Sequence, residues 1–273
     1  MSTLKFLRMR TGLVLLLLAG LLISPALVGA PRVQAAAAPL TERAAGVPAS
    51  TCTLNGAVRT CELWATTGTI TVAGNIIPIW GYSTTNTPGS ATLPGPVLVG
   101  NQNETLEVIL HNNLSEATSL NFPGSTLVPD TVGAAAGADI TYTFSLNDPG
   151  TFLYEAGLTD NGGVQVAMGM FGALVVRPAS NASWAYDRAD TAFDAEELLV
   201  LSEIDPDLNN NPAGFDMRYY KPKFWLVNGQ TFPDVGSVLV NKGNAVLLRY
   251  LNGGLLDHSI GVLGLNQTVM ATD

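Results

Sequence analysis

Apolar and polar residues alternate along most of the chain between residues 62 and 251. Short alternating runs rich in Val, Ile and Thr predict β-strands, because successive side chains of a strand point to opposite faces of a sheet. Gly, Pro and Asn separate the runs at the spacing of a β-sandwich or barrel. The pattern therefore predicts an all-β fold, with strands in the first half of the chain at residues 62–67, 69–72, 76–82, 97–99, 105–111, 138–146, 151–155 and 171–177.

The same pattern resumes after a polar, irregular connector that follows Pro178. A strand is predicted from Glu197, and two more on either side of the Asn-Gly pair at 228–229. From Glu197 onward there are 77 residues, fewer than the roughly 100 of a complete sandwich. We therefore predict a first domain, a connector and a partial second domain, at residues 50–178, 179–196 and 197–273.

The first 36 residues have the layout of a secretory signal peptide. Three basic residues precede an apolar run at residues 12–23, and a cleavage site with small residues follows near Ala35. The apolar run could instead stay in place as a membrane anchor, because its length nearly spans a bilayer. We expect signal cleavage after residues 1–36, a linker at residues 37–49, and secretion into the extracellular space or the periplasm.

The charge balance narrows the possible partners. The full chain has a formal net charge of −9, and removal of the leader leaves 9 basic against 22 acidic residues, a net charge of −13. A strongly acidic protein without a basic run is a poor match for nucleic acid or for an anionic membrane surface. We therefore expect no nucleic-acid partner and no membrane association after signal cleavage.

The two cysteines, Cys52 and Cys61, fall in the exported part of the chain, where a disulfide persists. They flank a hairpin signal, Asn55-Gly56. A two-residue turn at those positions would set Cys52 opposite Arg59, whereas a four-residue loop over residues 55–58 would set it opposite Cys61. We therefore predict a disulfide with the wider loop. A metal thiolate pair is the alternative, but no histidine lies near either cysteine in sequence.

Two stretches, LPGPVLVGNQNETLEVILHNNL at residues 93–114 and NDPGTFLYEAGLTDNGGVQVAMGMFGALVVRP at residues 147–178, resemble the first cupredoxin domain of a multicopper oxidase of the laccase type. The resemblance extends more weakly over residues 52–273. It implies a cupredoxin-like Greek-key β-sandwich followed by a second, partial cupredoxin-like domain. It also implies copper as the cofactor of the family and oxidoreductase activity.

The resemblance places the family's copper ligands on residues that are not histidine. The family motif Tyr-His-Ser-His reads Tyr-Glu-Ala-Gly here, and His-Trp-His-Gly reads Asn-Phe-Pro-Gly, so the four implied ligand positions hold Asn121, Pro123, Glu155 and Gly157. Pro123 has no metal-binding side chain, and an amide oxygen is a poor copper ligand beside imidazole. We therefore predict that these positions hold no copper.

A third implied ligand segment lies at residues 256–273. The family's His-Pro-x-His-x-His-Gly maps onto His258, Gly261 and Leu263 before Gly264, so only one of three positions is histidine. We expect His258 to be a structural histidine with a hydrogen-bond partner. The chain's other histidine, His111, stands at the end of the strand predicted at residues 105–111, before Asn112 and Asn113, and we interpret it as a turn residue.

Two histidines cannot supply the four His-x-His pairs that the family uses for its trinuclear copper cluster. We therefore predict no catalytic residue, no metal ligand and no cofactor in this chain, and leave open whether it is an enzyme. The leading hypothesis is a secreted, non-catalytic cupredoxin module. One alternative is a fragment or subunit of a laccase-like oxidoreductase whose copper site lies beyond Asp273 or on a partner chain. Another is an extracellular adhesion or carbohydrate-binding sandwich. The sequence specifies neither substrate nor partner.

Overall fold

The computed structural model describes residues 52–273, which belong to one compact unit, Ala35–Asp273. The predicted signal peptide and linker lie outside the described residues. Strands dominate the described part, and none of its helices is long and apolar enough to cross a membrane. The elements of the first half are β1 Thr53–Asn55, β2 Val58–Val72, β3 Asn75–Ser83, β4 Leu98–Asn101, β5 Thr105–Asn112, β6 Leu120–Asn121, β7 Asp139–Ser145, β8 Gly150–Ala156, α1 Gly162–Ala167 and β9 Phe171–Arg177.

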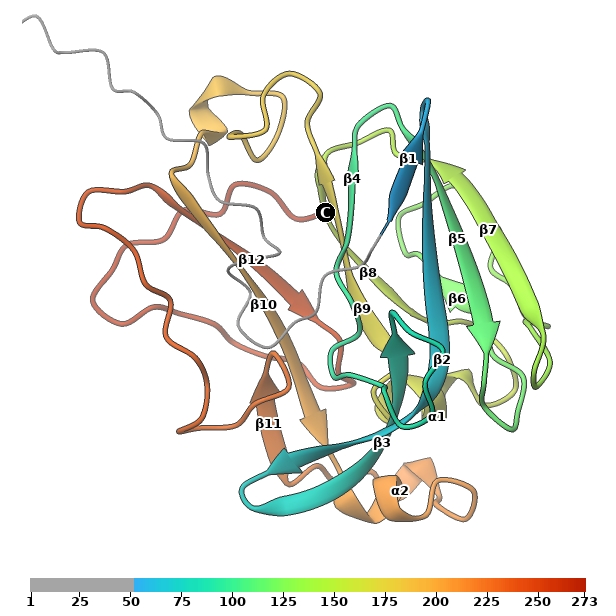
Figure 1. The fold of residues 1–273 in the computed structure, drawn as a ribbon. Helices are drawn as coiled ribbons and strands as arrows, with labels where there is room; N and C mark the ends of the chain where they lie inside the picture. The colour runs from blue at the N-terminus through green and yellow to red at the C-terminus, as the bar shows by residue number, and fades with distance from the viewer. Residues whose placement is uncertain (1–51) are drawn as a thin grey trace, which may run out of the picture. The chain divides into compact units, whose positions relative to one another are not determined.

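These strands form two sheets that pack face to face (Figure 1). One sheet has the order β1-β2-β5-β7, with β3 also paired to β2, and the other has the order β4-β9-β8-β6. Alternate residues of both sheets point into one shared core, which includes Leu63, Leu106, Tyr154 and Leu174. The predicted all-β, cupredoxin-like sandwich is therefore the observed fold.

Strand β2 is longer than the sequence pattern predicts. Residues 62–67 and 69–72 were expected as two strands, but β2 runs through Gly68 without a break. The backbone of Ala91 crosses directly over Gly68, at 2.7 Å from where a β-carbon would lie. The glycine is therefore needed for close packing of a loop on the strand, and it does not end the strand.

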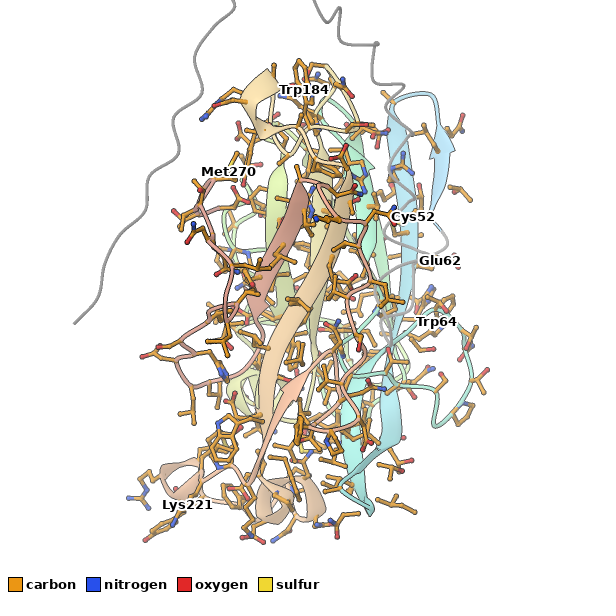
Figure 2. The ribbon with its side chains drawn as sticks, turned by 90° about the vertical axis from the view of Figure 1, so that its left-hand side faces the viewer. Cys52, Glu62, Trp64, Trp184, Lys221 and Met270 are labelled. Atoms are coloured by element: carbon orange, nitrogen blue, oxygen red, sulfur yellow. A yellow bond between two sulfur atoms is a disulfide. The ribbon has the colours of Figure 1, made fainter. Side chains whose placement is uncertain are left out.

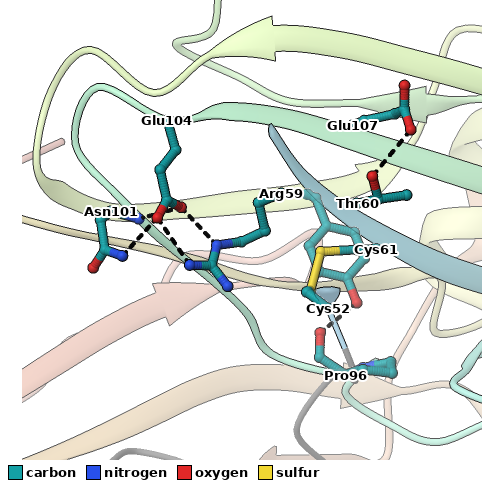
Figure 3. The surroundings of a disulfide bond; sticks show 9 residues. Cys52, Arg59, Thr60, Cys61, Pro96, Asn101, Glu104 and Glu107 are labelled. Carbon is teal, nitrogen blue, oxygen red and sulfur yellow. Dashed lines mark hydrogen bonds and ion pairs between the residues drawn. A yellow bond between two sulfur atoms is a disulfide. The ribbon is translucent and has the colours of Figure 1, made fainter. Parts of the chain in front are cut away.

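The amino-terminal hairpin brings the two cysteines together. Thr53 pairs with Thr60 and Asn55 with Val58, and a disulfide joins Cys52 to Cys61 (Figure 3). The predicted disulfide is confirmed, but the predicted four-residue loop is wrong. The turn has two residues, and the first of them is Gly56 at φ +61°. Asn55 and Val58, which were predicted to lie in the loop, form one more strand pair, and Cys52 still lies opposite Cys61.

An ion pair beside this hairpin joins β2 to the loop that precedes β5. Arg59 Nε donates to Glu104 Oε2 at 2.6 Å, and Asn101 Nδ2 donates to Glu104 Oε1 at 2.7 Å (Figure 3). Burial by itself raises the pKa of Glu104, but the hydrogen bonds from Arg59 and Asn101 outweigh it and bring the pKa to about 2. Glu104 is therefore ionised at neutral pH.

The second half contributes a three-stranded sheet with the order β11-β10-β12. Leu198 and Val200 of β10 pack into the same core as the first sandwich. Residues 224–251 were predicted to form a strand, a turn and a second strand. The structure has strands at residues 224–227 and from residue 246 onward. The turn at Asn228 and Gly229 and an irregular segment lie between them. The elements are η2 Ala189–Thr191, β10 Ala195–Ile204, α2 Pro206–Asn210, η3 Met217–Tyr219, β11 Phe224–Val227 and β12 Val246–Asn252.

Replacing Cys52 and Cys61 together by alanine should lower the free energy of unfolding by about 2–3 kcal/mol, because the unfolded chain gains the freedom of a loop of about ten residues. Urea unfolding of the oxidised protein and of the double variant measures the difference. Dithiothreitol should reduce the stability of the wild type to that of the variant and leave the variant unchanged. A wild type insensitive to dithiothreitol would contradict this.

Candidate functional site

The clearest candidate site is where β6 and β8 meet, at the positions that the family resemblance assigns to copper ligands. The two strands pair antiparallel, with Leu120 opposite Ala156 and Asn121 opposite Glu155. Asn121 Nδ2 donates to Glu155 Oε1 at 3.2 Å. The structure therefore brings two of the four implied positions into contact, and their side chains hydrogen-bond to each other. We call Ser119, Asn121, Glu155 and Gly157 the strand-end cluster.

Gly157 has no room for a side chain. Its backbone N–H donates to the carbonyl oxygen of Ser119 at 2.9 Å, and Ser119 Oγ occupies the place where a β-carbon on Gly157 would lie. Ser119 Oγ in turn donates to the carbonyl oxygen of Asp130 at 2.9 Å. An imidazole at this position would have to displace a serine that is already hydrogen-bonded.

Pro123 lies in the turn that follows β6. It lines a pocket of about 90 Å³, together with the rings of Phe122, Phe144 and Phe152 and the loop residues Asn147 and Asp148. The fourth implied ligand position therefore contributes to a pocket with both aromatic and polar lining at the margin of the sandwich core, and the proline side chain offers no metal-binding atom.

A buried glutamine holds the segment that precedes Ser119. Gln165 of α1 is fully buried, and its Nε2 donates to Glu116 Oε1 at 2.7 Å and to the carbonyl oxygen of Ala117 at 2.8 Å. Its Oε1 accepts from Thr118 Oγ1 at 2.8 Å. These bonds fasten the glycine-rich crossing to the segment that leads into β6. Protein groups thus satisfy the side chain of Gln165 and hold the segment that leads into the strand-end cluster.

Glu155 is the titratable group of this cluster. Burial raises the pKa of its carboxyl above the ordinary 4.5, and the hydrogen bond from Asn121 offsets only part of that rise. A carboxyl and an amide offer oxygen atoms, which suit hard cations better than copper, for which imidazole and thiolate are the characteristic ligands. The residues at this site therefore do not fit a laccase-type copper cluster.

The third implied ligand segment does not form a site either. His258 Nε2 lies 3.3 Å from Oε2 of the buried Glu203, which also accepts hydrogen bonds from the backbone N–H groups of Leu255 and Leu256. Gly261 has open space around it, and the side chain of Leu263 is fully exposed. The structure therefore places His258 as an anchor of the loop after β12, in keeping with a structural histidine.

His111 was predicted to lie in a turn, and this prediction is wrong. It lies within β5, where its ring stacks on Trp64 with 4.6 Å between centroids. Its Nδ1 is 2.8 Å from Asp139 Oδ1 on β7. Trp64 is on the outer face of β2, next to Glu62 (Figure 2). His111 therefore joins three neighbouring strands, and the strand continues because both of its edges are paired.

Across residues 52–273, no group of three or more His, Cys, Asp or Glu side chains is placed to hold a metal ion. The prediction that Asn121, Pro123, Glu155, Gly157, Gly261, Leu263 and His258 bind no metal remains a prediction, since only metal analysis tests it.

The arrangement of strands defines a cupredoxin-like protein, and comparison with solved structures gives the same class. The blue copper oxidase from Nitrosomonas europaea superposes with a TM-score of 0.59 at 19% identity, over 71% of this chain and 60% of that chain. Residues 82–181 match the model of the multicopper oxidase family. This part of the chain therefore resembles a multicopper oxidase domain.

Curated relatives extend the similarity to both halves of the chain. Copper resistance protein A of Escherichia coli is 24% identical over 231 residues, covering 66% of this chain and 37% of that protein. Multicopper oxidase MmcO of Mycobacterium tuberculosis is 24% identical over 213 residues, covering 67% of this chain and 42% of that protein. The chain thus spans about two fifths of the length of these relatives.

Replacing Gly157 by alanine should lower the free energy of unfolding by about 1–3 kcal/mol, because the new methyl group collides with Ser119. The matched control is Gly163→Ala in α1, where nothing lies within 4 Å of the added carbon and stability should be unchanged or slightly higher. Combining Ser119→Ala with Gly157→Ala should recover part of the loss. Urea unfolding measures the stability of all three variants. A Gly157→Ala variant as stable as the wild type would show that Ser119 does not block a side chain at this position.

Replacing Glu155 by glutamine should stabilise the protein at neutral pH by roughly a few tenths of a kcal/mol, after allowance for solvent screening. Because the folded pKa is raised, the wild type loses stability as the pH rises from 4.5 through the folded pKa, whereas the variant does not. The difference should vanish below pH 4.5. Urea unfolding between pH 4 and 8 tests this, with Glu62→Gln as an exposed control that should not reproduce the profile.

Proposed function

We propose that this chain acts as a non-catalytic cupredoxin module of a secreted, multicopper-oxidase-like protein. The observation that carries the proposal is the strand-end cluster. Asn121 and Glu155 bond to each other, and Ser119 fills the side-chain position of Gly157. A site emptied of ligands but left open would retain space for water at the former ligand positions. This site is closed, as expected for a structural junction.

Export is the second part of the proposal. The basic, apolar and small-residue regions at residues 1–36 have the layout of a secretory signal. The disulfide between Cys52 and Cys61 suits an oxidising compartment such as the periplasm or the extracellular space. In this setting a rigid, acidic sandwich would serve as a structural or interaction module.

One alternative is favoured by a separate observation. The chain spans about two fifths of copper resistance protein A and of multicopper oxidase MmcO. A copper-dependent oxidoreductase could therefore contain this chain as one part, with its copper held by residues outside it. In that case the module described here would still contribute no ligand from residues 121, 123, 155 and 157.

Metal analysis separates the two functions. We expect the purified chain, loaded with copper and dialysed, to hold well below one copper per molecule, to show no absorption band of a blue copper thiolate, and to consume no oxygen with a phenol. Stoichiometric copper that disappears in a His258→Ala variant would overturn the proposal. If copper and oxygen consumption appear only when further domains or a partner chain are added, the alternative is correct.

A further inference from the structure

A buried ionic cluster lies where β10 and β12 meet β8 and β9. Glu196 of β10 has a fully buried side chain, and its carboxylate pairs with two guanidinium groups. Arg249 Nε donates to Glu196 Oε2 at 3.0 Å, and Arg177 Nη2 donates to Glu196 Oε1. Two cations share one anion, so the cluster has an uncompensated positive charge.

Arg249 has donor capacity that the cluster does not use. The residue is 4% exposed, and its Nη1 donates to Thr151 Oγ1 on β8 at 2.8 Å. Its Nη2 is buried and has no hydrogen-bond partner among the described residues. A buried guanidinium N–H without an acceptor is costly, so the geometry calls for an anion close by.

Two further donors next to Arg249 converge on one carboxylate. The backbone N–H of Thr151 donates to Asp273 Oδ2 at 2.8 Å, and the Tyr186 hydroxyl lies 2.8 Å from both oxygens of the same carboxylate. The end of the chain accordingly lies beside β8 (Figure 1). Burial raises the pKa of Tyr186, and the hydrogen bond to Asp273 raises it further, so the phenol stays protonated and donates.

Gly150 provides the space for this carboxylate. A β-carbon on Gly150 would lie 2.8 Å from Asp273 Cγ. Thr151 N is an ideal donor here because β8 has β9 on one side at this point, and β6 reaches only residues 155 and 156 on the other. The site therefore combines the backbone N–H of Thr151, which no neighbouring strand uses, with the neutral hydroxyl of Tyr186. The buried Arg249, which belongs to a cluster with a net positive charge, lies beside them.

We propose that Thr151 N and Tyr186 Oη, beside the positive charge of Arg249, form a binding site for a carboxylate monoanion, which Asp273 fills from within the chain. One uncompensated positive charge matches one negative charge, and two donors about 3 Å from a planar group suit a carboxylate better than a tetrahedral dianion. When Asp273 is removed, the site takes a small free carboxylate such as acetate. This site is separate from the strand-end cluster and does not depend on the proposed function.

The test uses the full chain with Asp273→Ala and tyrosines labelled at the ring ζ-carbon. Acetate should shift the NMR signal of Tyr186 saturably in this variant and leave it unmoved in the wild type, whose site is filled. Adding Tyr186→Phe to Asp273→Ala should weaken acetate binding, measured by calorimetry, by about tenfold or more, which corresponds to the loss of one charge-assisted hydrogen bond. Asp257→Ala, at an exposed position of the loop after β12, is the matched control and should behave as wild type.

Asp273→Asn provides a second background in case the alanine variant unfolds, because the amide keeps the shape of the side chain and removes its charge. If acetate fails to shift Tyr186 in both variants, or if chloride at equal ionic strength shifts it as much, the site is only an internal contact of Asp273 and the proposal is wrong. Phosphate that binds more tightly than acetate would also overturn the assignment to a carboxylate.

Discussion

The core between the two sheets of the first sandwich is the constraint on which the other features depend. Leu63 and Leu106 of one sheet meet Tyr154 and Leu174 of the other, and Leu198 of β10 joins the same core. Burying each such side chain contributes about 1.5–3 kcal/mol, far more than any single polar contact at the strand ends. The core therefore fixes where β6 and β8 end. Asn121 and Glu155 face each other because packing places the two strands side by side.

The first sandwich could be predicted well because each strand there has a paired neighbour and one buried face. The strand at residues 171–177 has the predicted bounds, and β5 extends only one residue beyond the predicted end. The errors arise where the role of a residue depends on a contact with a segment that is distant in the sequence. Gly68 was taken as a strand end, but it makes room for Ala91, a contact that no window of sequence displays. Residues 237–245 contain the apolar run Val238 to Val240 and remain irregular, because such a run becomes a strand only where a partner strand pairs with it.

The candidate site could be located from the sequence only through the family motifs, and its chemistry could not be read that way. The motifs placed Asn121 and Glu155 correctly as neighbours. They gave no indication of Ser119, since serine is common in turns and strands and its closure of Gly157 depends on the exact approach of two segments 38 residues apart. The Glu196 and Arg249 pair was missed for another reason. Charged residues in a strand are usually taken to face solvent, and only the packing of β10 and β12 on β8 and β9 buries these two.

The two polar regions of the molecule differ in the property that decides whether a ligand can bind. At the strand-end cluster Ser119, Asn121 and the backbone N–H of Gly157 have protein partners, so an incoming ligand would have to break existing bonds and displace Ser119. At the seam between β8 and β12, Arg249 is paired with Glu196 and retains a buried donor without an acceptor among the described residues, and its neighbours Thr151 and Tyr186 donate to the carboxylate of Asp273. Exchange of one carboxylate for another leaves the number of bonds unchanged. We therefore expect a small anion to bind at the seam more readily than at the strand-end cluster.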